Sequence, residues 1–226
     1  MHNYPLTFTF APFSVTPQIE AKDSAGRVVL NASKKLISSK EEIAVTSGGQ
    51  PVCKIVSQES RITDIPSNWD IILPNGQVLG IVDDDFVSAV DTSSFIENRG
   101  VGMIVEHRLE RALNLKALKM HWLKSPAGAK VGLIAPEKNS LMAQQIPLYD
   151  IVRQLPLFFR FINAHYYIRL GDQTVMQLQK KRTWFIDTYV LEARGQFNAQ
   201  DEQLLVYSVV LALLYERQQL KDLFEA

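Results

Sequence analysis

The sequence has little cysteine, no net charge and no apolar stretch of membrane-spanning length. Of 226 residues only Cys53 is a cysteine, which excludes an intramolecular disulfide framework and a cysteine-rich zinc site. Lys and Arg number 24, as do Asp and Glu, so no whole-protein attraction to nucleic acid is expected. The first residues lack the basic and apolar regions of a secretory signal. The predicted location is therefore the cytoplasm, with a peripheral site at a membrane as an alternative.

The longest dense apolar run lies near the C-terminal end, at Leu204–Tyr215. As a helix its twelve residues would extend about 18 Å, whereas a bilayer core needs about 30 Å. Asp201 and Glu202 precede the run, and Glu216 and Arg217 follow it. These features predict a helix buried in protein, capped by Asn198 or Asp201 and ending near residue 224, and no transmembrane segment.

Most of the remaining chain has the pattern of short antiparallel strands separated by turns. Hydrophobic residues make up 46% and charged residues 21%, as in an ordinary globular protein, and the length suits one domain over residues 1–226. Asn75-Gly76 between two apolar runs is a strong hairpin signal. A hairpin is predicted at 19–30 with its turn at 23–26, and further turns at 47–50 and 171–172. Strands are predicted at 43–45, 52–56, 69–73, 78–82, 158–170, 174–179 and 183–192.

The segment from about 91 to 155 has no single clear pattern. Glu106–Lys119 contains good helix formers, although Lys116 falls on the apolar face. Leu118–Leu123 alternates in a way that also suits a strand, and both readings stay open. We therefore allow for barrel strands with a helical insertion, or for a small appendage, within 91–155.

The C-terminal run predicts a particular architecture because it is apolar nearly all round. Only Ser208 and Ala212 interrupt its large side chains. A helix without a polar face must be buried on every side. In a mainly β protein, threading the helix through a barrel of strands achieves this.

Several short motifs occur in an order that resembles a known family. They are Asp23-x-x-Gly26-x-Val28, then Gly49-x-Pro51-Val52-x-Lys54-Ile55, then Trp69-Asp70-Ile71 with Asn75–Gly80, then Gly171–Lys181, then Phe185–Glu192, and finally Asp201-x-x-Leu204-Leu205. Together they cover roughly residues 8–86 and 158–217. The chain resembles the tubby C-terminal-like superfamily, and within it the LURP-one-related and phospholipid-scramblase-like proteins.

The resemblance implies a mainly β fold: a closed antiparallel barrel of about twelve strands around a buried C-terminal helix. It implies little about activity. Tubby proteins bind phosphoinositide headgroups through surface lysine and arginine. Scramblase-like relatives are linked to calcium through a segment before the terminal helix, which here is Glu192–Glu202 and lacks the spacing of an EF-hand loop.

Known catalytic motifs are missing. The sequence has no Gly-x-Ser-x-Gly elbow, P-loop or complete Gly-x-Gly-x-x-Gly. His107 and Glu110 have helical i,i+3 spacing, but no second pair accompanies them, and Asp83-Asp84-Asp85 is interpreted as a solvated turn. Cys53 is interpreted as a buried structural thiol. No catalytic residue, metal site or cofactor is predicted.

The candidate binding residues are basic: Lys34, Lys35, Lys180, Lys181 and Arg182. On adjacent strands they could form an anionic headgroup site, because phosphate needs clustered donors. The alternative is a solvated face whose lysines balance carboxylates. We expect a non-enzymatic binding or scaffold module for an anionic lipid headgroup, such as a phosphoinositide, or for a protein partner, without nucleic acid. The alternative is an enzyme or carrier with a small-molecule pocket formed by 91–155.

Overall fold

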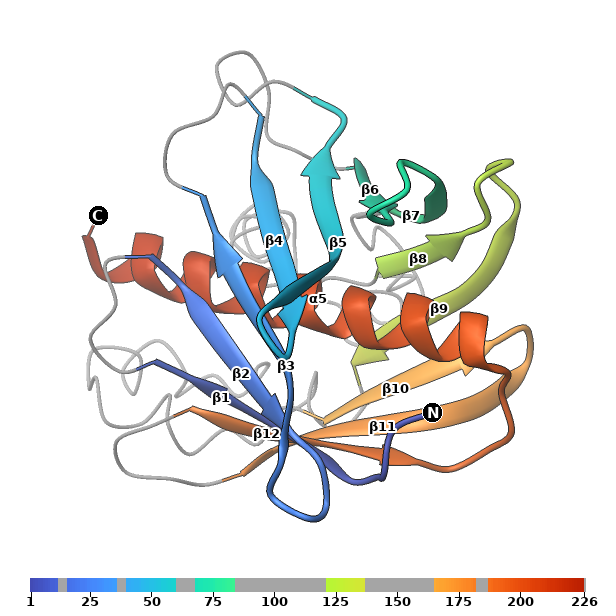
Figure 1. Ribbon diagram of the computed structural model, residues 1–226, viewed down its shortest axis with the longest axis horizontal. Helices are drawn as coiled ribbons and strands as arrows, with labels where there is room; N and C mark the ends of the chain where they lie inside the picture. The colour runs from blue at the N-terminus through green and yellow to red at the C-terminus, as the bar shows by residue number, and fades with distance from the viewer. Residues whose placement is uncertain are drawn as a thin grey trace, which may run out of the picture.

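Twelve strands close into an antiparallel barrel around a helix in the computed structural model (Figure 1). The structure describes residues 1–11, 16–35, 40–59, 68–83, 121–136, 165–181 and 187–225. The elements are β1 (Leu6–Phe10), β2 (Gln18–Lys22), β3 (Val28–Lys34), β4 (Glu42–Ser47), β5 (Gln50–Ser57), β6 (Asn68–Ile72), β7 (Val78–Asp83), β8 (His121–Lys124), β9 (Lys130–Pro136), β10 (His165–Leu170), β11 (Gln173–Lys181), β12 (Thr188–Ala193) and α5 (Ala199–Glu225).

Each strand pairs with its neighbours in the sequence, and β12 closes the ring on β1. At the closure Leu6 lies opposite Leu191 and Phe8 opposite Tyr189. The ring leaves no strand edge among the described strands for another chain to pair with. The predicted barrel fold is thereby confirmed.

Side chains along the strands alternate between the barrel interior and its outer surface. In β1 the interior residues Leu6, Phe8 and Phe10 are at most 2% exposed, whereas Thr7 and Thr9 between them are partly exposed. This period of two follows from the pleat of a strand. The inward residues of all the walls belong to one apolar core.

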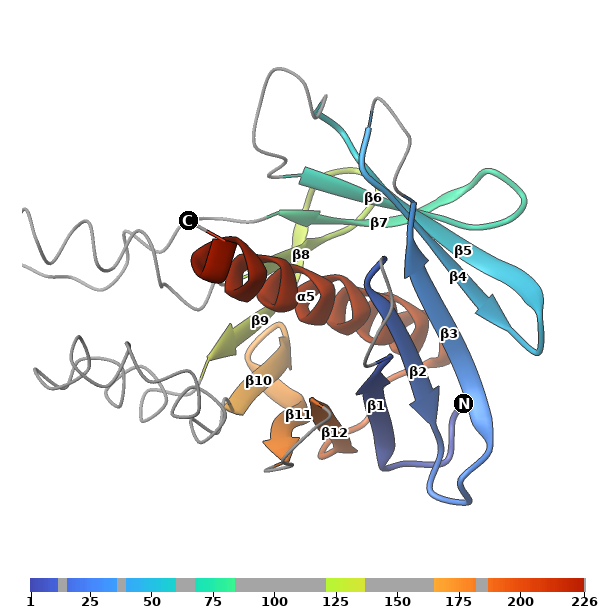
Figure 2. The ribbon, with the colours of Figure 1, turned by 90° about the vertical axis from the view of Figure 1, so that its left-hand side faces the viewer.

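Helix α5 passes through the middle of the ring of strands (Figure 2). Its N-terminus is capped by Asn198, whose Oδ1 accepts the Asp201 N–H at 2.8 Å. Every residue from Leu204 to Leu214 is buried, including Ser208, whose hydroxyl donates to the Leu204 carbonyl at 2.7 Å. Within the described ranges, no helix is both long and apolar enough to cross a bilayer.

The helix approaches the wall closely at Gly80 in β7. A Cβ atom there would lie 2.6 Å from Leu204 Cδ1 and 2.9 Å from the Lys124 carbonyl oxygen. Both distances are shorter than real Cβ contacts, so the lack of a side chain lets helix and wall meet here.

The two ends of the barrel differ. At the end where α5 begins, here called the turn end, short connections join the strands. Gly26 and Gly76 make such turns at φ of 77° and 83°, which glycine adopts without strain. At the opposite end, here called the exit end, β1, β3, β5, β7, β9 and β11 finish and α5 leaves the barrel.

The hairpins predicted around 23–26, 47–50, 74–76 and 171–172 are confirmed. In the segment without a clear pattern, β8 and β9 form a hairpin that completes the wall, which supports the strand reading at 121–123. Glu106–Lys119, residues 158–164 and 183–186, and the rest of 91–155 outside β8, its turn and β9, lie outside the described residues.

Candidate functional site at the exit end

The four predicted lysines that the structure describes all lie at the exit end of the barrel. Lys34 ends β3, Lys35 follows it, and Lys180 and Lys181 end β11. The adjacency of the two strands that a shared headgroup site would require is not present, because β2, β1 and β12 lie between them in the ring. Arg182 lies outside the described residues.

Each lysine pair is divided between the two faces of the wall. Lys180 follows the inward residues Met176 and Leu178 and is 7% exposed, whereas Lys181 is exposed on the outer face. Lys34 continues the inward row of β3, and Lys35 is exposed. Consecutive side chains in a strand point to opposite faces, so the two lysines of a pair do not converge.

Three of these lysines already have a carboxylate partner. The Nζ atom of Lys34 lies 2.9 Å from Glu41 Oε2, that of Lys35 2.5 Å from Glu42 Oε1, and that of Lys180 3.2 Å from Asp187 Oδ1. A phosphate arriving at these ammonium groups would have to displace or bridge those partners.

The same end holds a carboxylate that the sequence analysis did not select. Glu216, near the exit end of α5, accepts hydrogen bonds from the Tyr166 hydroxyl at 3.1 Å and the Tyr189 hydroxyl at 3.0 Å. The Lys180 ammonium lies 5.2 Å from the centre of the Tyr189 ring. The group joins α5 to β10, β11 and β12.

The surroundings of Glu216, whose side chain is partly exposed, shift its pKa. Desolvation raises the pKa of Glu216, and the nearby Lys180 charge and the two phenol hydrogen bonds lower it only in part. Desolvation, followed by the Glu216 charge, raises the pKa of Tyr166 and Tyr189 well above that of free tyrosine. Both phenols are therefore neutral donors at physiological pH.

The two neighbours of Glu216 contact other walls. The Tyr215 ring meets Trp69 of β6 edge-on, with 5.9 Å between centroids. The Arg217 guanidinium lies 4.5 Å from the centre of the Phe10 ring in β1, and its Nη2 donates to the Ala11 carbonyl at 3.3 Å. Three consecutive residues thus fix the helix to three parts of the rim.

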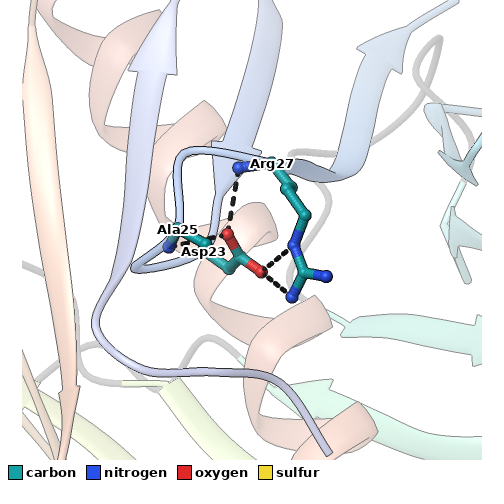
Figure 3. Close-up of polar contacts among 3 residues, drawn as sticks. All are labelled: Asp23, Ala25 and Arg27. Atoms are coloured by element: carbon teal, nitrogen blue, oxygen red, sulfur yellow. Dashed lines mark hydrogen bonds and ion pairs between the residues drawn. The ribbon is translucent and has the colours of Figure 1, made fainter.

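Asp23 organises a turn at the other end of the barrel (Figure 3). Its Oδ1 accepts the N–H groups of Ala25 and Arg27, both at 3.0 Å, and its Oδ2 accepts two guanidinium N–H groups of Arg27 at 2.9 and 2.7 Å. The side-chain bond from Arg27 is the main cause of a lowered Asp23 pKa. Both oxygens of Asp23 thus find their hydrogen-bond donors within the turn, and these bonds fix the β2–β3 turn.

The described residues offer little for catalysis. Cys53 faces the core, and burial raises its thiol pKa to about 12, so the thiolate needed of a nucleophile is rare at neutral pH. No three His, Cys, Asp or Glu side chains of the described ranges gather to hold a metal ion. Asp83 pairs with Lys124, while Asp84, Asp85, Asp91, His107 and Glu110 lie outside those ranges.

The residues that sequence reasoning missed are Tyr166, Asp187, Tyr189 and Glu216. Glu216 was interpreted only as a charged flank of the apolar run. The available signal was that a glutamate one position beyond a buried helical segment must still lie near the barrel wall. Its partners come from strands 27 and 50 residues away, and only the register brings them together.

Comparison of the sequence with protein-family models and with curated proteins gives no match. The resemblance to tubby-like and scramblase-like proteins therefore stays a prediction.

Proposed function

We propose that this protein is a non-enzymatic binding module and that it recognises a protein partner at the exit end of its barrel. The observation that carries the proposal is that, in the described part of this end, three of its lysines are paired with carboxylates.

The barrel interior supports recognition at an end or on the outer surface. Barrels that carry small molecules hold them between the walls. Here that space is filled by α5, whose residues Leu205, Val209 and Val210 are fully buried against the strands. The alternative of a carrier or enzyme pocket gains no support from residues 121–136, because Leu123 and Ile134 lie in the same core.

The charges at the exit end favour a protein surface over an anionic membrane. Among the described residues of this end, Lys34, Lys35 and Lys180 each pair with a carboxylate. A membrane of anionic lipids attracts uniformly basic surfaces. Paired charges of both signs instead complement a surface that also carries both signs, and such complementarity provides specificity between proteins.

Charge reversal at the two ends tests the proposal. Lys35→Glu with Lys181→Glu changes two outward residues of the exit end, and Lys22→Glu with Arg194→Glu is a matched change at the turn end. Partners are cross-linked in cells of the source organism and quantified by mass spectrometry. We expect recovery of at least one protein to fall about tenfold in the exit-end variant alone, which corresponds to about 1.4 kcal/mol of binding free energy.

Equal recovery of partners with the wild-type protein and with both charge-reversal variants would contradict recognition at the exit end. The same proteins are also sedimented with vesicles containing phosphoinositide, at two salt concentrations. Pelleting that depends on the lipid, weakens with salt and is lost in the exit-end variant would replace the protein partner by an anionic headgroup.

A further inference from the structure

The first residues of the chain lie at the turn end of the barrel, where they precede β1 and belong to no strand (Figure 2). The Ser24 N–H of the β2–β3 turn donates to the Asn3 carbonyl at 3.1 Å. The Tyr4 ring meets Phe197 edge-on, with 6.0 Å between centroids. Residues 1–5, here called the strap, thus contact both the β2–β3 turn and the loop that leads into α5.

Glu202, in the first turn of α5, anchors the strap. Only 3% of this residue is exposed. Its Oε1 accepts the His2 N–H at 2.8 Å, and its Oε2 lies 3.6 Å from the Met1 amino group. A buried carboxylate needs such donors because its desolvation is otherwise costly. The strap therefore supplies polar partners that the start of the helix requires.

The Tyr4 hydroxyl makes the contact between strap and barrel imperfect. Its oxygen is buried, yet it has no hydrogen-bond partner among the described residues. Desolvation and, after it, the Glu202 charge raise the pKa of Tyr4, so the hydroxyl lies near that carboxylate without reaching the geometry of a hydrogen bond. Leaving a buried polar group unpaired is unfavourable, and water would satisfy the hydroxyl once the strap lifts. This contact therefore favours release.

We propose that the strap is releasable: it lifts from the turn end while the barrel stays folded, and its release uncovers Glu202 and Phe197 at the start of α5. β1 begins at Leu6 and pairs with β12 and β2 on its two sides, so its place in the wall does not depend on the strap. Met1 is 78% exposed, and few bonds hold the residues that follow it. Local openings of this kind require less free energy than global unfolding.

Hydrogen exchange at the Ser24 amide reports on the strap, because the acceptor of this amide is the Asn3 carbonyl. The Ala25 and Arg27 amides belong to the same turn but donate to Asp23, so they serve as control amides. In the wild-type protein we expect Ser24 to exchange at least about 100-fold faster than the slowest amides of β1, because a local opening suffices.

Glu202→Gln keeps an oxygen for the His2 N–H and removes the negative charge. Hydrogen bonds to charged groups are about twice as strong as neutral ones, so we expect exchange at Ser24 to quicken at least about fivefold. Exchange at the control amides and in β1 should not change. Asp201→Asn, a change of the same kind at the preceding residue, should leave Ser24 at the wild-type rate.

A second variant, Tyr4→Phe, covers the case in which Glu202→Gln does not fold. It removes the unpaired hydroxyl and keeps the ring against Phe197, so exchange at Ser24 should slow at least about threefold. Exchange at Ser24 as slow as in β1 would overturn the proposal. So would a Glu202→Gln effect that is absent or equally large in β1, or exchange in Tyr4→Phe that is unchanged or faster.

Discussion

Asp23 and Glu216 are carboxylates near opposite ends of the barrel, and their proton affinities are shifted in opposite directions. Asp23 receives backbone N–H groups and the Arg27 guanidinium, which lower its pKa. Desolvation raises the pKa of Glu216, and the hydrogen bonds from two neutral hydroxyls lower it only in part. The ionised form is thus favoured at the turn end and disfavoured at the exit end.

Replacing Asp23 by Asn should destabilise the protein near neutral pH and lose effect in acid. The lowered folded pKa gives a stabilisation that is present above the unfolded value of 3.8 and disappears as pH falls through the folded value. We expect a Tm about 2–4 °C lower at pH 7. Melting curves at pH 7 and pH 3 check this, and a difference that does not shrink in acid would contradict it.

The Cys53 thiol should be almost inert in the folded protein. A pKa of about 12 against the ordinary 9.0 leaves about 1000-fold less thiolate at neutral pH. Reaction with a thiol-specific reagent should therefore slow at least about 1000-fold relative to the protein in denaturant. Rapid labelling of Cys53 in the folded protein would contradict this prediction and show that the wall at β5 opens.

At the scale of single elements, α5 supplies the centre of the apolar core. Val210 is fully buried in the middle of the helix, so Val210→Asp would place a charge among apolar side chains. We expect this variant to be insoluble or unfolded. Gln203→Asp, at an exposed position of the same helix, should fold with nearly wild-type stability. Soluble yield and melting by circular dichroism compare the two, and a normally melting Val210→Asp would contradict the buried helix.

The elements that sequence reasoning found are those whose signals are local. Turn residues such as Asn75-Gly76 require positive φ, and the apolar run could be accommodated only inside a protein. The β8–β9 hairpin was harder to find, because His121–Lys124 is short and directly follows a segment of good helix formers. The division of Lys180 and Lys181 between faces follows from strand alternation alone, and was available from the sequence.

At the scale of the whole molecule, closure of the barrel decides which residues meet. The order of the turns indicated antiparallel neighbours, and the all-round apolar helix indicated a ring. The Glu216 cluster was not predictable, because it depends on the rotation of α5 within that ring. The residue before Glu216, Tyr215, faces Trp69, and the residue after it, Arg217, faces Phe10. Only Glu216 faces Tyr166 among these three.

The position of α5 in the chain also affects biosynthesis. Among these elements the ribosome makes β1 first. The strand that pairs with β1 at the closure, β12, is the last of the described strands to be made, and α5 follows it. Until then the inward faces of all the walls lack the side chains that cover them. Such long-range contacts form slowly and leave apolar surface open to aggregation. The barrel therefore cannot be completed before α5 has been made, and until then its inward faces stay open to aggregation.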